Sequence, residues 1–255
     1  MKKFFVLALL LYCLLSAACA APPLDTSCLT PEQIEQLRAE YPFYFQNSSI
    51  LLTDEVTVER ALRLVDCIAI VEITSQEEKA VHDVALPGDL LEKLGEDAAA
   101  STRKAFGTYA HFTLKVEKVL WRNPPNPVDK EREETTAQDN EEIVDGKEYT
   151  TIKSAYPELP AVVREPGTRL VLPLSWGTRY SAFEHSLNFS MNFAYYLMPD
   201  EYLLSFSPDP ACEAYTGAKL EVLIADVKKQ MDAMYADFDG FWQRYWDDYN
   251  QDTAE

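Results

Sequence analysis

The chain has 255 residues, with 23 basic and 42 acidic side chains and a net charge of −19. A surface this acidic repels phosphate backbones, which excludes a nucleic-acid partner. It also repels anionic lipid headgroups, so any attachment to a membrane has to be covalent.

Residues 1–18 have the pattern of an export signal. Lys2 and Lys3 precede an apolar run of twelve residues, Phe4 to Leu15, and small residues follow it. A helix that spans a bilayer needs about 20 apolar residues, so this run is too short for a permanent anchor. Removing the signal leaves 21 basic and 42 acidic residues, a net charge of −21. We therefore expect the mature protein to work outside the cytoplasm.

The segment LSAAC, positions 15–19, resembles the lipobox of bacterial lipoproteins of the Gram-positive type. In that family a dedicated peptidase cuts just before the cysteine, whose thiol carries a diacylglyceryl group. The resemblance implies that Cys19 is the lipid-modified N-terminus, that residues 19–29 form a lipidated tether, and that the protein lies on the extracytoplasmic face of the cell membrane. Ser16 departs from the motif, because leucine is usual at that place.

The same stretch leaves a second route of processing open. Ala18-Cys19-Ala20 fits the small-x-small site of ordinary signal peptidase, which would release a secreted protein beginning at Ala21. We favour lipidation, because a cysteine at the end of such an apolar run is otherwise uncommon.

The cysteines downstream of the signal differ in their surroundings. Cys67 lies in an apolar segment and is expected to be a small buried side chain. Cys28 and Cys212 both lie in polar sequence typical of loops. They are candidates for a disulfide that would tie the N-terminus to the region before the last helix, and the sequence alone leaves this pairing open.

The first half of the mature chain predicts two helices and two strands. The segment TPEQ at 30–33 has a threonine N-cap followed by proline, so a helix begins there and runs to about Glu40. Apolar spacing predicts a second helix at 56–65, which leads into a buried strand over Asp66–Thr74. Alternating polar and apolar residues predict a half-buried strand over Thr108–Trp121.

The connections and the second half are read in the same way. We expect a helical insertion around residues 89–103 and a polar loop over Asp129–Glu148, which holds nine acidic and three basic residues. A strand is predicted over Gly167–Leu174. Residues Phe193–Pro208 predict a hairpin that turns at Pro199-Asp200.

The C-terminal region predicts a long helix. Apolar side chains recur at three- and four-residue steps over about residues 219–250, and Gly240 is a site for a kink. Packing of the aromatic end against the core is favoured over the alternative, an exposed stripe that binds a protein or a glycan of the envelope. The stripe would consist of Trp242, Tyr245, Trp246 and Tyr249.

Four segments in order, ERALRLVDCIAIVEIT, FTLKVEKVLWR, PGTRLVLPL and PDEYLLSFSP, cover about residues 56–208. Their pattern resembles the small OB-like barrels of netrin-like and metalloproteinase-inhibitor domains. We therefore expect an α+β fold that is mainly β: a small OB-like antiparallel β-barrel with N-terminal helices and a long C-terminal helix. Residues 30–255 would form this single globular domain.

The fold resemblance does not bring the inhibitors' activity with it. In those inhibitors a free N-terminal cysteine amine meets the zinc of the protease, and a second cysteine follows two residues later. This chain has Cys19-Ala20-Ala21, so the second cysteine is missing.

The sequence shows no catalytic or metal-binding constellation. Its three histidines, His82, His111 and His185, are isolated, and there is no C-x-x-C pair, P-loop or G-x-S-x-G motif. We therefore expect no catalytic residue, no metal and no cofactor. The expected protein is a non-enzymatic extracytoplasmic lipoprotein that acts as an interaction or envelope-associated module. The alternatives are an exported hydrolase whose site comes from scattered residues, and a solute-binding lipoprotein.

Overall fold

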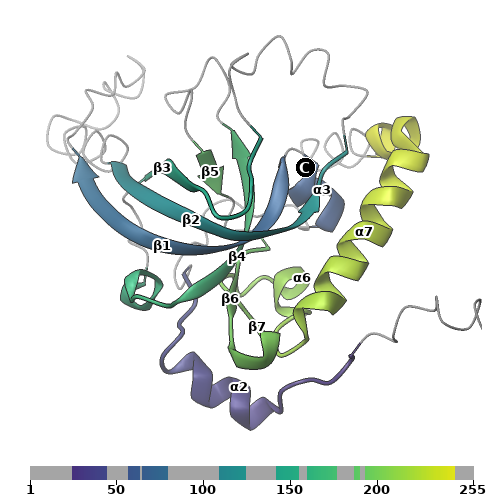
Figure 1. Cartoon of the computed structure of the whole chain (residues 1–255). Coiled ribbons are helices and arrows are strands. Elements are labelled where there is room, and N and C mark those ends of the chain that lie inside the picture. Colours follow the sequence, from purple (N-terminus) through teal and green to yellow (C-terminus); the bar gives the residue numbers. More distant parts are fainter. Residues whose placement is uncertain are drawn as a thin grey trace, which may run out of the picture.

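The computed structural model describes residues 25–44, 57–63, 65–79, 109–124, 142–154, 160–176, 187–189 and 193–244. These residues form a mixed α and β fold with a seven-stranded sheet and several helices (Figure 1). The expected export signal and the expected helical insertion at 89–103 lie outside the described residues, as does the first part of the expected polar loop.

The centre of the sheet is formed by three long strands. β1 (Cys67–Lys79) and β2 (Tyr109–Arg122) pair along their whole length, which confirms both predicted strands, and β1 continues past Thr74. β4 (Arg169–Trp176) pairs with the other edge of β1, from Cys67↔Leu174 to Glu72↔Arg169. β1 is thus a central strand, which pairs with β2 on one edge and with β4 on the other.

Two strands, β3 (Glu148–Ser154) and β5 (Leu187–Phe189), were not predicted. β3 pairs with β2, and Tyr149 and Thr151 point to the buried side. Its alternation is short and follows directly on an acidic stretch, so the charge pattern concealed it. β5 pairs antiparallel with β4 and meets β3 in parallel at Thr151↔Leu187, whereas the other strand pairs are antiparallel.

The predicted hairpin is confirmed. β6 (Tyr195–Leu197) and β7 (Leu203–Ser205) are antiparallel, and the short 3-10 turn η2 (Pro199–Glu201) joins them. Asp200 has φ 58° in this turn, a left-handed conformation that aspartate tolerates better than most residues. β6 pairs with β4, which places the hairpin beside the central strands.

The sheet separates two apolar cores, because successive side chains of a strand point to opposite faces. In β1, Cys67, Ala69, Val71 and Ile73 belong to the first core, whereas Ile68 and Ile70 belong to the second. β4 and β6 also contribute to both. Burial on both faces explains why these strands read as nearly continuous apolar runs rather than as clean alternation.

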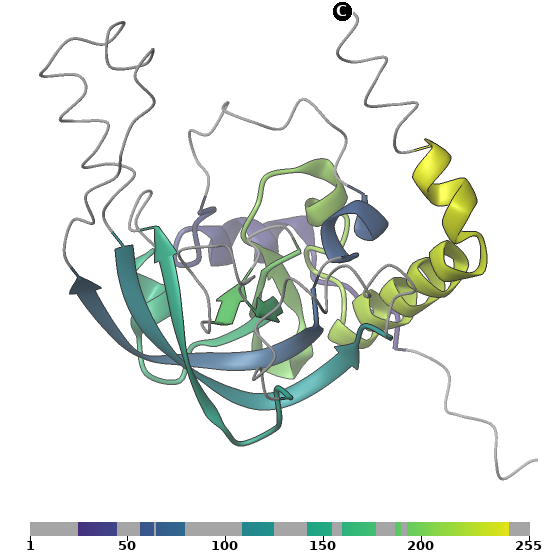
Figure 2. The same ribbon diagram turned by 90° about the horizontal axis from the view of Figure 1, so that it is seen from above.

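Helices α3 (Val58–Leu62) and α7 (Leu220–Ala236) cover the second core and touch each other (Figures 1 and 2). α3 is shorter than the helix predicted at 56–65. The 3-10 turn η1 (Ala161–Arg164) packs on β1, and the short helix α6 (Pro210–Glu213) follows β7. At the N-terminus, α2 (Pro31–Arg38) confirms the predicted helix and its Thr30 cap.

The C-terminal helix is interrupted at a different place from the one predicted. α7 ends at Ala236, Asp237 has φ −131° and ψ 55°, and residues 238–244 are helical again. The break is therefore at Asp237 and not at Gly240. The Asp237 carboxylate occupies the space that a Cβ at position 240 would need, so the glycine makes room for this new helix start.

Candidate functional site

The N-terminal arm, residues 25–38, lies on the surface of the domain. The backbone N–H of Leu29 donates to the carbonyl of Gly217 at 2.9 Å, and Cys28 forms an antiparallel bridge with Ala218. The hydroxyls of Ser27 and Tyr202 are 3.1 Å apart. Residues 27–29 are therefore held at a defined place on the folded domain.

Lys219 joins the start of the arm to the β6–β7 turn. Its Nζ donates to the carbonyl of Asp200 at 2.5 Å, lies 3.7 Å from an oxygen of Asp25, and sits 3.9 Å from the centre of the Tyr202 ring. Hydrogen bonds from Ser27, with the nearby charge of Lys219, hold the pKa of the Asp25 carboxyl below its usual value. Asp25 is consequently an anion at neutral pH.

Arg38 fastens the other end of the arm. Its guanidinium donates to the carbonyl of Ser205 at 2.7 Å and to the carboxylate of Glu213 at 2.5 Å, and it lies 3.8 Å above the Phe43 ring. The Arg38 side chain is only 15% exposed. Burial lowers the pKa of this guanidinium and the carboxylate of Glu213 opposes that shift, so the ion pair keeps the buried cation charged.

α2 itself fits closely against the loop before α7. It buries none of its residues completely, although Ile34 and Leu37 pack partly against the first core. Gly217 has φ +80°, and a Cβ there would lie 2.9 Å from the Cδ1 of Ile34. Glycine at 217 is thus required both by the backbone conformation and by the approach of the arm.

Cys28 and Cys212, the candidates for a disulfide, are both free cysteines in the structure. Cys28 is exposed, and its thiol approaches the carbonyl of Thr26. Cys212 lies on α6 with its side chain in the second core, where burial raises the pKa of the thiol to about 11. The polar residues around position 212 suggested a loop, but they flank a short helix whose inner side is apolar.

Of the aromatic residues predicted to form the C-terminal stripe, the structure describes only Trp242. Trp242 is half-buried and packs edge-on against Phe238 and Phe241, beside the second core. The guanidinium of Arg63 lies 5.7 Å from the centre of its ring. Tyr245, Trp246 and Tyr249 lie outside the described residues. Most of the Trp242 ring is therefore engaged by the domain.

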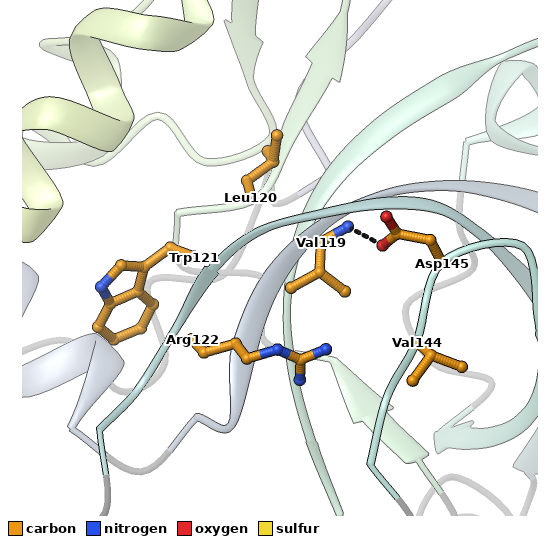
Figure 3. A pocket seen from close by; sticks show the side chains of 6 residues that line it. All are labelled: Val119, Leu120, Trp121, Arg122, Val144 and Asp145. Atoms are coloured by element: carbon orange, nitrogen blue, oxygen red, sulfur yellow. Dashed lines mark hydrogen bonds between the residues drawn. The ribbon is translucent and has the colours of Figure 1, made fainter.

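A shallow hollow of about 530 Å³ lies at the end of β2 (Figure 3). Its polar groups bond to one another: the N–H of Val119 donates to Asp145 at 2.7 Å, and Arg122 donates to the carbonyl of Ile143 at 2.5 Å. These bonds brace the segment 142–146 against the part of β2 that lies beyond its pairing with β3. The residues around the hollow therefore have a structural role, which is to hold the segment 142–146 against β2.

Arg38, Lys219 and Tyr202 were not singled out from the sequence. Arg38 stands in the last turn of a helix, where a basic residue is ordinary. Its partners lie 167 and 175 residues further along the chain, and no local pattern indicates such contacts.

Among the described residues, no group of three or more His, Cys, Asp or Glu side chains is placed to hold a metal ion. Within the same residues, no helix combines the length and apolar character that crossing a membrane requires. His82 and His185 lie outside the described residues, and His111 lies in β2. No protein-family model, curated protein or solved structure matches the chain.

Proposed function

We propose that this chain is an extracytoplasmic lipoprotein, anchored in the cell membrane through Cys19, whose domain is a non-enzymatic interaction module. The observation that carries the proposal is the position of Asp25, which is exposed and held on the domain surface six residues beyond the lipobox cysteine. From there, Cys19 can reach a bilayer while every described helix and strand stays folded.

The proposed domain is an OB-like barrel. In the strand order β1-β2-β3-β5-β4, β4 pairs back with β1, so each of these five strands has a neighbour on both edges. The parallel contact of β3 with β5 and the hairpin β6–β7 beside β4 are consistent with this arrangement. The support for the barrel is thus the order of its strands.

The proposed partner is a protein or a glycan of the cell envelope, bound by the aromatic end of the chain. Trp242, half-buried on the domain, would hold this end in place. Tyr245, Trp246 and Tyr249 would then supply the contacts, because aromatic side chains carry much of the binding energy at such surfaces.

The anchoring is tested by the intact mass of the mature protein. The full chain is produced in a bacterium that processes lipoproteins, and the membrane fraction is extracted with detergent. We expect a chain that begins at Cys19 and carries a diacylglyceryl group, and we expect Cys19→Ser to abolish both the cut before residue 19 and the lipid.

Cys28→Ser is the matched control, because it removes an exposed thiol nine residues away and should leave processing unchanged. An unmodified chain that begins at Ala21 and is recovered from the soluble fraction would contradict the proposal and support a secreted protein.

The partner site is tested with two tryptophan variants in the anchored protein, using capture from envelope extract. We expect Trp246→Ala to reduce the captured partner at unchanged thermal stability. Trp242→Ala should lower the melting temperature, because this ring packs on the domain. Equal capture by Trp246→Ala and the unaltered protein would remove the aromatic end as the binding element.

A further inference from the structure

Asp25, the first residue of the arm, lies at the end of the molecule where α7 begins. The backbone N–H of Asp25 donates to Glu221 in the first turn of α7 at 2.5 Å. Figure 1 shows α2, the β6–β7 turn and the start of α7 at this end, and α7 runs from it toward the opposite end. The 17 residues of α7 rise by about 25 Å along the helix axis.

The tether is short compared with the domain. Asp25 is the sixth residue after Cys19, and a fully extended chain of six residues spans at most about 22 Å. A compact domain of roughly 230 residues is on the order of 45 Å across. A lipid on Cys19 therefore keeps the Asp25 end within about 22 Å of the membrane while the arm is docked, and it sets no such limit on the far end of α7.

The charge at the Asp25 end opposes close adsorption to lipid. Its exposed acidic residues come from the arm, the β6–β7 turn and α7: Asp25, Glu32, Glu35, Asp200, Glu201 and Glu221. Lys219 lies among them and is occupied by Asp25, Asp200 and Tyr202. An anionic membrane surface repels such an end over about one Debye length.

We propose that the same end of the anchored domain always faces the membrane, and that the docked arm sets this orientation. The membrane-facing end consists of residues 25–29, the β6–β7 turn and the N-terminus of α7, and α7 points away from the bilayer. This inference rests on the proposed function, because it needs a lipid at Cys19.

The exposed face of α7 provides a ruler for the test. In a Cys28→Ser background, single cysteines replace the partly exposed Ala225 and the exposed Lys229 and Ala236, and each carries a fluorescent donor. Cys67 and Cys212 are buried and do not react in the folded protein. The lipidated protein is placed in phosphatidylcholine–phosphatidylglycerol vesicles that contain an acceptor lipid. Energy transfer should fall from position 225 to 229 to 236, and equal transfer at the three positions would overturn the proposal.

The role of the arm is tested by a charge reversal in the same series. Lys219→Glu removes the contacts to Asp25 and Asp200 and places a second acid beside Asp25, so the arm should detach and the gradient of transfer should flatten. Lys228→Glu makes the same change of charge at an exposed position of α7 and should keep the gradient. An unchanged gradient in Lys219→Glu, or equal flattening in both variants, would overturn the role of the arm.

A parallel preparation separates this proposal from the anchoring itself. A chain that begins at Cys19 is coupled through its N-terminal aminothiol to a cyanobenzothiazole lipid and measured in the same vesicles. If this sample gives the gradient of energy transfer while the protein from cells carries no lipid, the orientation is supported and natural lipidation is contradicted. Natural lipidation with a flat profile would overturn the orientation alone.

Discussion

The two terminal helices are attached to the same domain by different forces. α7 buries five apolar side chains in the second core: Leu220, Leu223, Val227, Met231 and Met234. α2 has no fully buried residue and is held by the Arg38 ion pair, the Thr30 capping box and the strand-like contacts of residues 25–29. Apolar burial makes α7 part of the global fold, whereas α2 can detach while the rest stays folded.

This difference fits the membrane anchoring that we propose. The packing of α7 on the second core uses apolar side chains, so the attachment of this helix does not depend on charge or on pH. In the proposed orientation the arm would lie between the membrane and the domain, and its polar contacts would fix that orientation without adding to the core. The following predictions are ordered from the largest expected effect to the smallest.

Truncation in α7 should cost much more than truncation in α2. Leu223→Ala removes a side chain with no exposed surface and should lower the free energy of unfolding by about 3 kcal/mol. Ile34→Ala in α2 removes a partly buried side chain and should cost less than about 1 kcal/mol. Urea unfolding of the two variants measures both values. Losses of equal size would show that α2 and α7 belong to one cooperative unit.

Loss of the Arg38 ion pair should release α2 alone. Arg38→Ala removes hydrogen bonds to a carboxylate and a carbonyl, which we expect to cost about 2 kcal/mol in the stability of the docked arm. Amide exchange should accelerate in α2 and stay slow in α7. Arg38→Lys should recover part of the loss, because an ammonium cannot reproduce the planar fork.

Arg244→Ala is the control for charge, because its ion pair with Asp237 is largely exposed and should contribute little. Faster exchange in α7 as well as α2 after Arg38→Ala would refute a separate arm.

The cap of α2 should have a smaller and still local effect. Thr30 accepts from the N–H of Gln33, and the Gln33 side chain accepts from the N–H of Thr30. Thr30→Ala should therefore reduce the stability of α2 by about 1 kcal/mol, whereas Thr30→Ser keeps the hydroxyl and should be nearly neutral. Amide exchange of Ile34, whose N–H bonds to Thr30, reports the change.

Acid should loosen the start of the arm before it affects α7. The pKa of Asp25 is lowered from 3.8 in the folded protein, so its contribution is complete above about pH 4 and is lost as the pH falls through the folded pKa. The Leu29 amide, which bonds to Gly217, should shift in NMR spectra over that range, and Leu223 should not. Asp25→Asn should remove this pH dependence. A simultaneous change of both amides would instead indicate global acid unfolding.

Local patterns predicted most elements correctly. The Thr30-Pro31 start of α2 and the alternation of β2 each depend on residues that are close in sequence, so they are visible without a structure. β3 was missed because its short alternation adjoins an acidic stretch. The helix break was placed at Gly240, although the cause is Asp237, which leaves the helix and begins a new one.

The sites were less predictable than the elements. The aromatic spacing placed Trp242 beside the second core or on a stripe, and the structure has it half-buried. The Cys28–Cys212 bridge was inferred from polar surroundings, but the side chain of Cys212 turns inward on α6. In both cases the direction of a side chain depends on how its helix packs, which sequence spacing alone does not determine.

The sequence by itself determined most of the elements of this protein and its lipobox resemblance, because periodicity, capping and turn chemistry act over a few residues. The tertiary structure decided where the arm lies. Arg38 reaches Ser205 and Glu213, and Asp25 reaches Lys219 and Glu221, across most of the chain. Such contacts form only after the sheet and α7 have assembled, since it is their packing that brings these distant residues together.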